Sequence, residues 1–382
     1  MRIAIFDYEV VSTNPVGSCH LRMLEGLCKE HEFTVFAVEF ENPCPESIRF
    51  VRIPVPTRPL VLLFIAYHLV APVVYLLYRL STGTRFELIQ MVESNVSFGS
   101  ISYTHFCHRA YLRHHWKQSG GKGLRAWLRY LDHWLHALVE PRTFRRVRHI
   151  VVASRGLKQE LEETYPFTHG KVTVISNHVE LSRMARPAGF DRERFRRGRG
   201  ASAEDVVFAF VALGHFDRKG LALVLDALRL LADSRVKLWV VGGEPDLVAA
   251  WQARVQAMGL AGQVTFWGMQ RDVRPFLWGA DAFIFPSIYE GFPLVSLEAA
   301  AAGLPLIVTP VHGVEEFMRD GEVGFIVEHC TTGVLKGIQR FLALPSAERE
   351  RMGARAQNSV ARYSVESFLQ AWRAFYERAF LG

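Results

Sequence analysis

The sequence predicts an α/β protein with two Rossmann-like domains, whose parallel sheets face a central cleft. Three observations support this fold class. Short, continuous apolar runs alternate with helical patterns, as expected of parallel strands that helices cover on both faces. The alternation pauses at residues 177–200, where the Arg, Gly and Pro content is typical of an exposed linker, and then restarts. The length of 382 residues also suits about two domains, each with its own core.

The expected strands fall into two series. In the first domain they are Arg2–Phe6, Phe33–Val38, Leu88–Val92, Ser100–His105 and Ile150–Ala153. In the second domain they are Val206–Leu213, Val236–Val241, Val264–Phe266, Ala282–Phe285, Leu306–Val308 and Gly324–Val327. Because ligands of such sheets bind at the carboxyl ends of the strands, we expect the binding site in the cleft between the domains.

Composition excludes several classes of protein. Apolar residues make up 49% of the chain and charged residues 22%, as in ordinary globular proteins. The five cysteines are scattered and show no C-x-x-C spacing, so we expect neither a disulfide framework nor a zinc site, and a reducing compartment. The N-terminus "MRIAIFDYEV" is typical of a first strand and not of a secretory signal. We therefore expect the protein to be cytoplasmic.

The net charge of +7 is concentrated in one segment. Residues 109–148 hold ten Lys or Arg against two acids, Asp132 and Glu140, with Tyr111, Trp116, Trp127, Tyr130 and Trp134 among them. This pattern suits an anionic membrane surface, where bases meet headgroups and aromatic rings lie at the interface. Nucleic acid is not expected, because no recognised binding module is present. The alternative is a solvated helix face whose tryptophans pack inward.

One apolar run, residues 59–80, is long enough to raise the question of a membrane span. His68 and Pro72 interrupt it, and a helix beside a sheet would be equally apolar. We expect a core or membrane-surface helix here, with a transmembrane helix as the weaker alternative.

The stretch "SIYEGFPLVSLEAAAAGLPLIV", residues 287–308, holds two glutamates in an apolar setting. A buried strand precedes it, and a helix is expected over Pro293–Ala302, ended by Gly303. That helix has almost no polar face, so Glu298 should be buried and should need a partner. A basic side chain or the hydroxyl groups of a ligand are the two candidates, and the sequence favours the ligand.

The start of this helix adds an anion site. The first-turn N–H groups around Leu294 and Val295 and the helix dipole both favour a negative charge. A carboxylate for hydroxyls beside amides for phosphate indicates a nucleotide sugar. The alternative is a capping glutamate at Glu290 and a satisfied buried one at Glu298.

A second loop carries positive charge. "GHFDRKG", residues 214–220, follows the first strand of the second domain and precedes a helix expected over Leu221–Leu231, so Arg218 and Lys219 could neutralise a diphosphate. A basic pair at a helix start is often only solvated. No D-x-D pair occurs in the sequence, so we expect no divalent metal and no other cofactor.

Taken together, these segments resemble a GT-B-fold glycosyltransferase of the retaining family 4 type. The resemblance rests on "VVASRGLKQELEE", "KVTVISNHVE", "GHFDRKGL", "LWVVGGEP" and the long segment from "VTFWGMQRDV" to "GEVGFIV". It implies an acceptor-binding domain at residues 1–182, a donor-binding domain at 183–362 and a C-terminal helix at 363–382 that returns to the first domain.

The resemblance also implies roles for residues at the donor. Glu290 would lie near the transferred sugar and Glu298 on the ribose hydroxyls. The amides of Phe292, Leu294 and Val295 would approach the sugar and the phosphates. Base recognition would fall in residues 267–273, around Met269, through backbone contacts.

The first domain matches the family more loosely. His105 resembles the family's strand-end histidine near the reacting sugar, with His108 as a near alternative, and His105 and Glu290 would orient the attacking hydroxyl and the sugar. The family's Gly-Gly loop retains only Gly17, in "STNPVGS". His215 stands where many members have Arg, and "NHVE" replaces a common Asn-Gly-Val-Asp, so phosphate binding would depend on Arg218 and Lys219.

The function implied is transfer of a sugar, with retention, from a nucleotide sugar to a glycan or lipid-linked glycan in envelope or extracellular polysaccharide biosynthesis. The enzyme would be metal-independent and peripherally bound to the inner face of the cell membrane. The sequence leaves the nucleotide, the sugar and the acceptor open. A GT-B nucleotide-sugar epimerase, a sugar phosphorylase and a non-catalytic membrane scaffold remain as alternatives.

Overall fold

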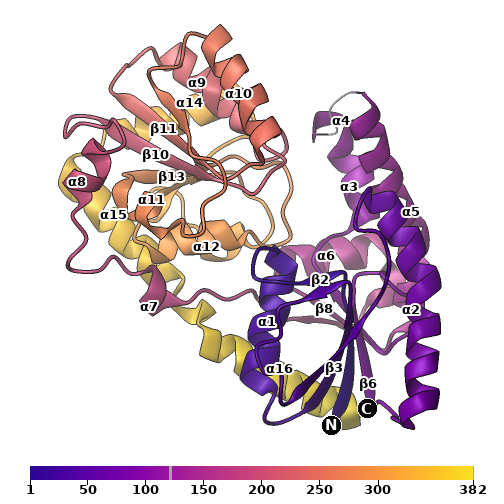
Figure 1. Cartoon of the computed structure of the whole chain (residues 1–382). Helices are drawn as coiled ribbons and strands as arrows, with labels where there is room; N and C mark the ends of the chain where they lie inside the picture. The colour runs from indigo at the N-terminus through magenta and orange to yellow at the C-terminus, as the bar shows by residue number, and fades with distance from the viewer. Residues whose placement is uncertain (120–122, 382) are drawn as a thin grey trace. The chain divides into compact units, whose positions relative to one another are not determined.

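The computed structural model describes residues 1–119 and 123–381, which divide into two compact units (Figure 1). Unit 1 consists of Met1–His178 and the C-terminal segment that begins at Val365. Unit 2 is Val179–Ser364. Each unit has its own parallel sheet, so the predicted fold class of two α/β units with parallel sheets is confirmed.

Seven parallel strands form the sheet of unit 1, in the order β5-β3-β1-β6-β7-β8-β9. Their bounds are β1 Arg2–Phe6, β3 Glu32–Ala37, β5 Ile48–Arg52, β6 Leu88–Val92, β7 Ile101–Thr104, β8 His149–Val152 and β9 Val172–Val174, and β2 (Glu9–Val10) pairs separately with β4 (Glu39–Phe40). The sequence pattern does not predict β5 or β9, the two edge strands of this sheet. An edge strand is only partly buried, and β5 alternates two arginines with apolar residues, so it lacks the continuous apolar run of an inner strand.

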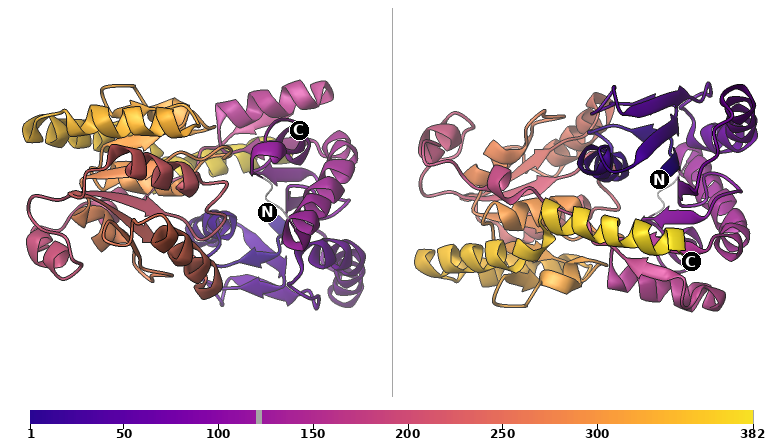
Figure 2. Two further views of the ribbon diagram at one scale, coloured as in Figure 1. Left: turned by 90° about the horizontal axis from the view of Figure 1, so that it is seen from above. Right: turned by 90° about the horizontal axis from the view of Figure 1, so that it is seen from below.

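Helices cover both faces of this sheet (Figure 1). They are α1 Pro15–Leu27, α2 Leu60–Thr82, α3 His108–His114, α4 Trp116–Ser119, α5 Leu124–Arg146, α6 Arg155–Thr164, a 3₁₀ turn at Pro166–Thr168 and α16 Val365–Leu381. The last of these lies beside α1, as the right panel of Figure 2 shows. Gly26 permits this contact, because a Cβ there would lie 2.4 Å from the side chain of Leu369. The C-terminal helix is therefore part of unit 1.

Six parallel strands form the sheet of unit 2, in the order β12-β11-β10-β13-β14-β15. Their bounds are β10 Val206–Val211, β11 Val236–Val241, β12 Val264–Phe266, β13 Ala282–Phe285, β14 Leu306–Val308 and β15 Gly324–Ile326. The helices are α7 Leu181–Met184, α8 Arg192–Arg197, α9 Leu221–Leu231, α10 Pro245–Ala257, α11 Arg274–Gly279, α12 Leu294–Ala301, α13 Val314–Phe317, α14 Thr331–Leu342, α15 Ser346–Ser359 and a 3₁₀ turn at Ala361–Tyr363. The expected strands all form, and their ends differ from the prediction by one or two residues at most.

Many of residues 177–200 are exposed as expected, but the expectation that they form a linker is wrong. They contain α7 and α8, and most of the segment belongs to unit 2. Arg196 is 3% exposed and donates to Asp281 at 2.9 Å and to the carbonyl of Gly279 at 3.0 Å, while the indole of Trp278 donates to the carbonyl of Met184 at 2.7 Å. Arginine is usually exposed, but a paired and hydrogen-bonded arginine can be buried, and composition does not show the partner.

Strand order places a switch point in each sheet. In unit 1 the chain adds β3 and β5 on one side of β1, and then adds β6 and its successors on the other. In unit 2 it adds β11 and β12 on one side of β10, and then β13 on the other. Ligands of open α/β sheets bind outside the carboxyl ends of the strands at such a reversal. A ligand is therefore expected at the loops that follow β1 and β6 in unit 1, and at those that follow β10 and β13 in unit 2.

Candidate active site

At the switch point of unit 2, the loop after β10 packs against the loop after β13. The N–H of Ile288 donates to the carbonyl of Arg218 at 3.0 Å, and the hydroxyl of Ser287 donates to the same carbonyl at 3.3 Å. Gly220 has a φ of +81°, and a Cβ there would lie 2.2 Å from the carbonyl oxygen of Pro286. Only glycine fits this approach, so the segment "DRKG" is built to touch the segment "PSIYE".

The two loops join Lys219 to Glu290. The ammonium of Lys219 forms an ion pair with Oε1 of Glu290, and the hydroxyl of Ser287 donates to the same oxygen at 2.6 Å. Only 16% of the Lys219 side chain and 11% of the Glu290 side chain are exposed. In the sequence the two residues belong to separate motifs, 71 positions apart. The structure brings them together.

Burial and mutual attraction act in opposite directions on this pair. Burial lowers the pKa of Lys219 to about 8, although the charge of Glu290 opposes the shift. Burial alone would raise the pKa of Glu290, but the charges of Lys219 and Arg218 outweigh it and hold that pKa below its usual value. Both groups are therefore charged at neutral pH. Because the two charged groups are already fixed in position, they need no reorganisation when a bound ligand gains charge.

The second glutamate, Glu298, has no such partner. It lies on α12, is half-buried, and makes no side-chain hydrogen bond to any described residue. Burial raises its pKa to about 7, and the charge of Arg183 lowers it only in part. Glu298 is thus partly buried, where full burial was expected. Its place on the ribose hydroxyls stays a prediction.

Helix α12 begins at Leu294, with Pro293 as the preceding cap residue, so the expected helix was one residue too long at each end. Gly303 follows the helix with a φ of +81°, as predicted. Leu294 and Val295 lie in the first turn, where N–H groups have no partner within the helix, and both are half-buried. Ser296 adds a group that the sequence analysis missed, because its hydroxyl is buried in this first turn without a partner among the described residues. Such an oxygen is a candidate ligand contact.

Phe292 and Met269 lie in different settings. Phe292 is 6% exposed, and its ring packs against Gly313, where a Cβ would lie 2.5 Å away. Met269 is 45% exposed in the loop that follows β12. That loop is tied to the loop after β11, because the N–H of Gly242 donates to the carbonyl of Gly268 at 2.7 Å. The contacts predicted for Phe292 and Met269 with a donor remain predictions.

In unit 1, Gly17 has a structural reason to be glycine. It lies in the first turn of α1, where its N–H donates to the capping side chain of Asn14 at 3.0 Å. A Cβ on Gly17 would lie 2.5 Å from the carbonyl oxygen of Glu9 and 2.9 Å from the amide of Val11. Close packing of α1 on β2 accounts for this residue without a ligand, and its expected role in donor binding stays a prediction.

His105 lies directly after β7, at the carboxyl edge of the sheet. Its Nε2 is buried and has no hydrogen-bond partner among the described residues. Burial lowers its pKa to about 3, and the nearby His20 adds to the shift, so the imidazole is neutral. An unpartnered imidazole nitrogen at this edge can bind a substrate hydroxyl.

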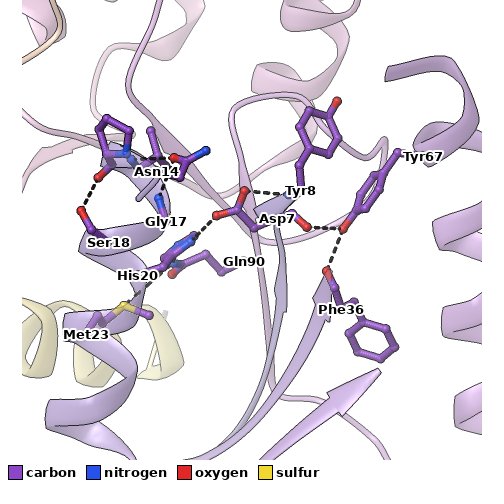
Figure 3. Close-up of polar contacts among 12 residues, drawn as sticks. Asp7, Tyr8, Asn14, Gly17, Ser18, His20, Met23, Phe36, Tyr67 and Gln90 are labelled. Atoms are coloured by element: carbon purple, nitrogen blue, oxygen red, sulfur yellow. Dashed lines mark hydrogen bonds and ion pairs between the residues drawn. The ribbon is translucent and has the colours of Figure 1, made fainter. Parts of the chain in front are cut away.

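A buried polar network surrounds His20 in the same unit (Figure 3). Nδ1 of His20 contacts Asp7 at 2.8 Å, Nε2 of His20 contacts the amide of Gln90 at 2.9 Å, and the hydroxyl of Tyr376 donates to Gln90 at 2.9 Å. The chain of contacts joins β1, α1, β6 and α16. It satisfies each of these buried groups, and so it accounts for them as fold stabilisation.

Helices α2 and α5 lie side by side (Figure 1). Both present apolar side chains to solvent. The inner face of α2 packs on unit 1, where the hydroxyl of Tyr67 donates to the carbonyls of Phe36 at 2.7 Å and Asp7 at 3.0 Å (Figure 3). The large exposed apolar residues are Leu60, Leu62, Ile65, Leu69, Val73, Leu76, Leu77 and Leu80 on α2, with Leu124, Trp127, Tyr130, Trp134 and Leu138 on α5. Among the described residues, α2 is the one helix long and apolar enough to cross a membrane.

The side chains of the basic segment, residues 109–148, differ in exposure. Arg113, Lys117, Arg142, Arg145, Arg146 and Arg148 are exposed, whereas Lys122 and the side chain of Arg125 lie outside what the structure describes. Tyr111 is buried, so it is not part of an aromatic surface as expected, and Asp132 and Glu140 are buried as well. Glu140 accepts from the N–H of His108 at 2.7 Å and from the hydroxyl of Tyr165 at 2.7 Å. The inner face of α5 is therefore acidic and buried, and its outer face is apolar.

One group in the described residues has the donor set of a metal site. The ligand atoms of Glu93, His108 and His136 lie within 4.8 Å of one another. The two imidazole rings, however, are stacked, with centroids 4.2 Å apart and planes 9° apart. A metal bound by an imidazole lies near the plane of the ring, and two parallel planes this far apart share no such point. The group does not fit a metal as it stands.

Comparison with known proteins gives one family match in each of the two units. The family described as glycosyl transferases group 1 matches residues 205–343, and the family described as glycosyltransferase family 4 matches residues 16–183, so the two matches span most of the chain. The chain belongs to the group 1, family 4 glycosyltransferases. The match in unit 2 contains Lys219, Glu290 and Glu298, and the match in unit 1 contains Gly17 and His105.

A curated relative and two solved structures illustrate the likeness. The lipopolysaccharide core biosynthesis glycosyltransferase LpsE of Rhizobium meliloti is 32% identical over 165 residues, which cover 42% of this chain and about half, 47%, of that protein. The structure of WaaG, described as a glycosyltransferase involved in lipopolysaccharide biosynthesis, has a TM-score of 0.77 at 17% identity and covers 97% of this chain and 98% of its own. Anabaena HepE in complex with UDP-glucose has a TM-score of 0.75 at 17% identity over 99% of this chain and 100% of its own. The structural matches show that the fold is GT-B, as predicted.

Proposed function

We propose that the protein transfers a sugar from a nucleotide-sugar donor to a glycan or lipid-linked glycan, with retention of configuration at the transferred sugar and without a metal. The observation that carries the proposal is the buried Lys219–Glu290 pair at the switch point of unit 2. The family membership supports the reaction class. The names of the lipopolysaccharide relatives support a role in envelope polysaccharide biosynthesis, and the HepE complex supports a UDP-sugar donor.

The residues of unit 2 divide the work as follows. Lys219, Arg218 and the first-turn amides at Leu294 and Val295 stabilise the negative charge that grows on the diphosphate as its bond to the sugar breaks. Glu290, held in place by Lys219, accepts hydrogen bonds from hydroxyls of the sugar. Glu298 does the same for the ribose, and this supplies the partner that its half-buried carboxylate lacks. The attacking hydroxyl belongs to the acceptor, and His105 in unit 1 orients it.

Two other reaction classes use similar sites. A nucleotide-sugar epimerase would consume the donor without an acceptor, and a sugar phosphorylase would depend on free phosphate. A membrane scaffold would bind no donor at all. The charged, buried pair favours the transferase over the scaffold. Burial of two charges costs desolvation free energy, and a scaffold would have no use for such a pair.

Nucleotide binding and product analysis test the proposal. We expect UDP-, GDP- or ADP-sugars of one nucleotide class to raise the Tm of the purified protein, with no effect of EDTA, because a ligand of the native state stabilises it by mass action. We expect nuclear magnetic resonance of the product to show retained anomeric configuration. Absence of stabilisation by every nucleotide, or stabilisation that EDTA abolishes, would contradict the donor site described above.

We also propose that α2 and α5 bind the protein peripherally to the inner, anionic face of the cell membrane. An apolar face of this extent exceeds what scattered exposed residues leave on a soluble protein, and exposed arginines of α5 and its C-terminal end add charge attraction. A full span by α2 is disfavoured, because Leu63, Phe64, Tyr67 and Ala71 pack into unit 1.

Vesicle flotation tests this surface. The wild type should float with vesicles that contain phosphatidylglycerol and should float less with phosphatidylcholine alone. The double variant Trp127→Ser/Trp134→Ser should weaken binding about tenfold or more, because it removes two large apolar side chains from the interface. The control Leu230→Ser changes a similarly exposed apolar residue on α9 and should bind as the wild type does. Equal flotation of all three proteins would count against the surface.

A further inference from the structure

The switch point of unit 1 holds a buried carboxylate without a partner. Asp132, on the inner face of α5, is 9% exposed, and its carboxylate makes no hydrogen bond to any described residue. It interacts electrostatically with His108 and Glu93, and burial raises its pKa to about 6. A buried acid without a hydrogen bond is costly, so a group that donates to it is missing from the described chain.

Glu93 follows β6 directly and offers a second carboxylate at the same place. Its φ is +48°, an uncommon value for a residue other than glycine, and such backbone strain concentrates at functional sites. Its Oε2 contacts Nε2 of His108 at 3.0 Å, while its Oε1 makes no hydrogen bond to any described residue. The side chain is 14% exposed, so that oxygen can accept from a small ligand.

His108 holds Glu93 in this position. Its Nδ1 contacts Nδ1 of His133 at 2.9 Å, so both of its ring nitrogens are engaged. The side chain of Glu140 fixes the first residue of α3 by accepting the N–H of His108. Burial lowers the pKa of His108, but the hydrogen bond to Glu93 and its charge raise it further, so the net shift is upward. Because both ring nitrogens are engaged, His108 positions Glu93 and has no free ring nitrogen for a metal.

Tyr8 completes the group from the neighbouring strand. It follows β1, on the other side of the switch point, and its hydroxyl is buried without a partner among the described residues. Tyr8 and Glu93 each lie two residues beyond Phe6 and Met91, which are opposite each other in β1 and β6.

Asp132 precedes His133, whose ring contacts that of His108, the partner of Glu93. The charges of Asp132 and Glu93 act on the Tyr8 hydroxyl, in agreement with this placement. Two carboxylates that accept and a phenol that donates or accepts form a set for hydroxyl groups. The two negative charges disfavour a phosphate.

We propose that Tyr8, Glu93 and Asp132, with His108 as the positioning residue for Glu93, form the acceptor subsite and bind an uncharged, hydroxyl-bearing sugar of the acceptor. This inference rests on the proposed function and gives unit 1 a named set of acceptor contacts. The apolar outer face of α5 lies on the same helix as Asp132, so an acceptor with a lipid and a sugar would meet both faces.

Binding of soluble glycosides tests the subsite without turnover. The probe is a panel of methyl glycosides at millimolar concentration, observed by saturation-transfer difference nuclear magnetic resonance on the full chain. We expect at least one glycoside to bind the wild type. Glu93→Gln and Asp132→Asn should each weaken it about tenfold, because hydrogen bonds to a charged group are stronger than those to an amide. Glu46→Gln, an exposed carboxylate in the same unit, should bind as the wild type does.

Tyr8→Phe tests the subsite in a variant that should fold normally. Its hydroxyl has no partner in the described chain, so its removal should keep the Tm while weakening glycoside binding about fivefold. His108→Gln should weaken glycoside binding less than Glu93→Gln does, since it loosens Glu93 without removing it.

The outcomes separate this subsite from the donor site. Absence of glycoside binding, equal binding by Tyr8→Phe and the wild type, displacement of the glycoside by inorganic phosphate, or binding that requires added Zn²⁺ would overturn the subsite. The expected variant pattern supports it even when no nucleotide stabilises the chain, a result that would instead contradict the proposed donor. Stabilisation by a nucleotide should be the same in all four variants and in Glu46→Gln.

Discussion

The switch points of the two units both hold a carboxylate, but they pair it differently. In unit 2, Glu290 is paired with Lys219, which is charged at all pH values below about 8. In unit 1, Glu93 is paired with the imidazole of His108 at 3.0 Å, and its other carboxylate oxygen has no hydrogen-bond partner among the described residues. The first arrangement supplies a lasting positive charge beside an acid, which suits a ligand that gains negative charge. The second supplies acceptors for hydroxyl groups. The same place in the sheet thus serves different chemistry because the partner of the acid differs.

The largest effect should come from breaking the charged pair. We expect Glu290→Ala and Lys219→Met each to lower kcat at least tenfold, as loss of an electrostatic contact to a developing charge does. Because the two side chains act as a unit, Lys219→Met/Glu290→Gln should cost little more than the worse single variant. Steady-state kinetics and circular dichroism of each variant check this.

The control for these variants is Lys336→Met, which removes an exposed lysine from α14 of the same unit. It should keep the activity of the wild type. Full activity in both Glu290→Ala and Lys219→Met, with all proteins folded, would show that the pair is only structural.

The candidate site in unit 2 could be predicted because its signals are local in the sequence. The segment from Glu290 to Glu298 and the loop with Lys219 each follow an apolar strand, and strand, turn and helix are neighbours in the chain. What the sequence did not give is their contact, because pairing across 71 positions depends on strand order. The roles of His105 and Gly17 rested on resemblance alone.

The acceptor subsite proposed for unit 1 is largely absent from the sequence prediction for the same reason. Glu93, His108 and Asp132 come from three elements, and only strand order and helix packing bring them together. One signal was available, since Asp132 and Glu140 are the two acids in a strongly basic segment, and both prove to be buried. An isolated acid among bases and aromatic residues is a reason to expect an inward-facing side chain.

The second prediction concerns the alkaline limb of activity. The pKa of Lys219 is lowered to about 8, so its charge is present below that pH and is lost above it. We expect kcat/KM, which reports the free enzyme, to fall above pH 8 by about tenfold for each further unit. Lys219→Met has no proton to lose there, and its residual kcat/KM should lack this limb. A wild-type profile that stays level to pH 10 would mean that the charge of Lys219 is not used.

The smallest effect concerns Glu298, which differs from Glu290 in forming no ion pair with a described residue. Its pKa is raised to about 7, so the folded state holds a proton that the unfolded state releases near its ordinary value. The stability that this proton gives is present at low pH and is lost as the pH rises through about 7. Glu298→Gln keeps the neutral form at every pH. We therefore expect the variant to match the wild-type Tm at pH 5 and to exceed it at pH 8 by about 2–4 °C, the shift that 1 kcal/mol gives in a domain of this size.

A bound nucleotide should reverse the order at pH 8, because only the carboxylate accepts strongly from the ribose hydroxyls. Equal Tm values at both pH values would mean that solvent reaches Glu298 well enough to remove the cost of its charge.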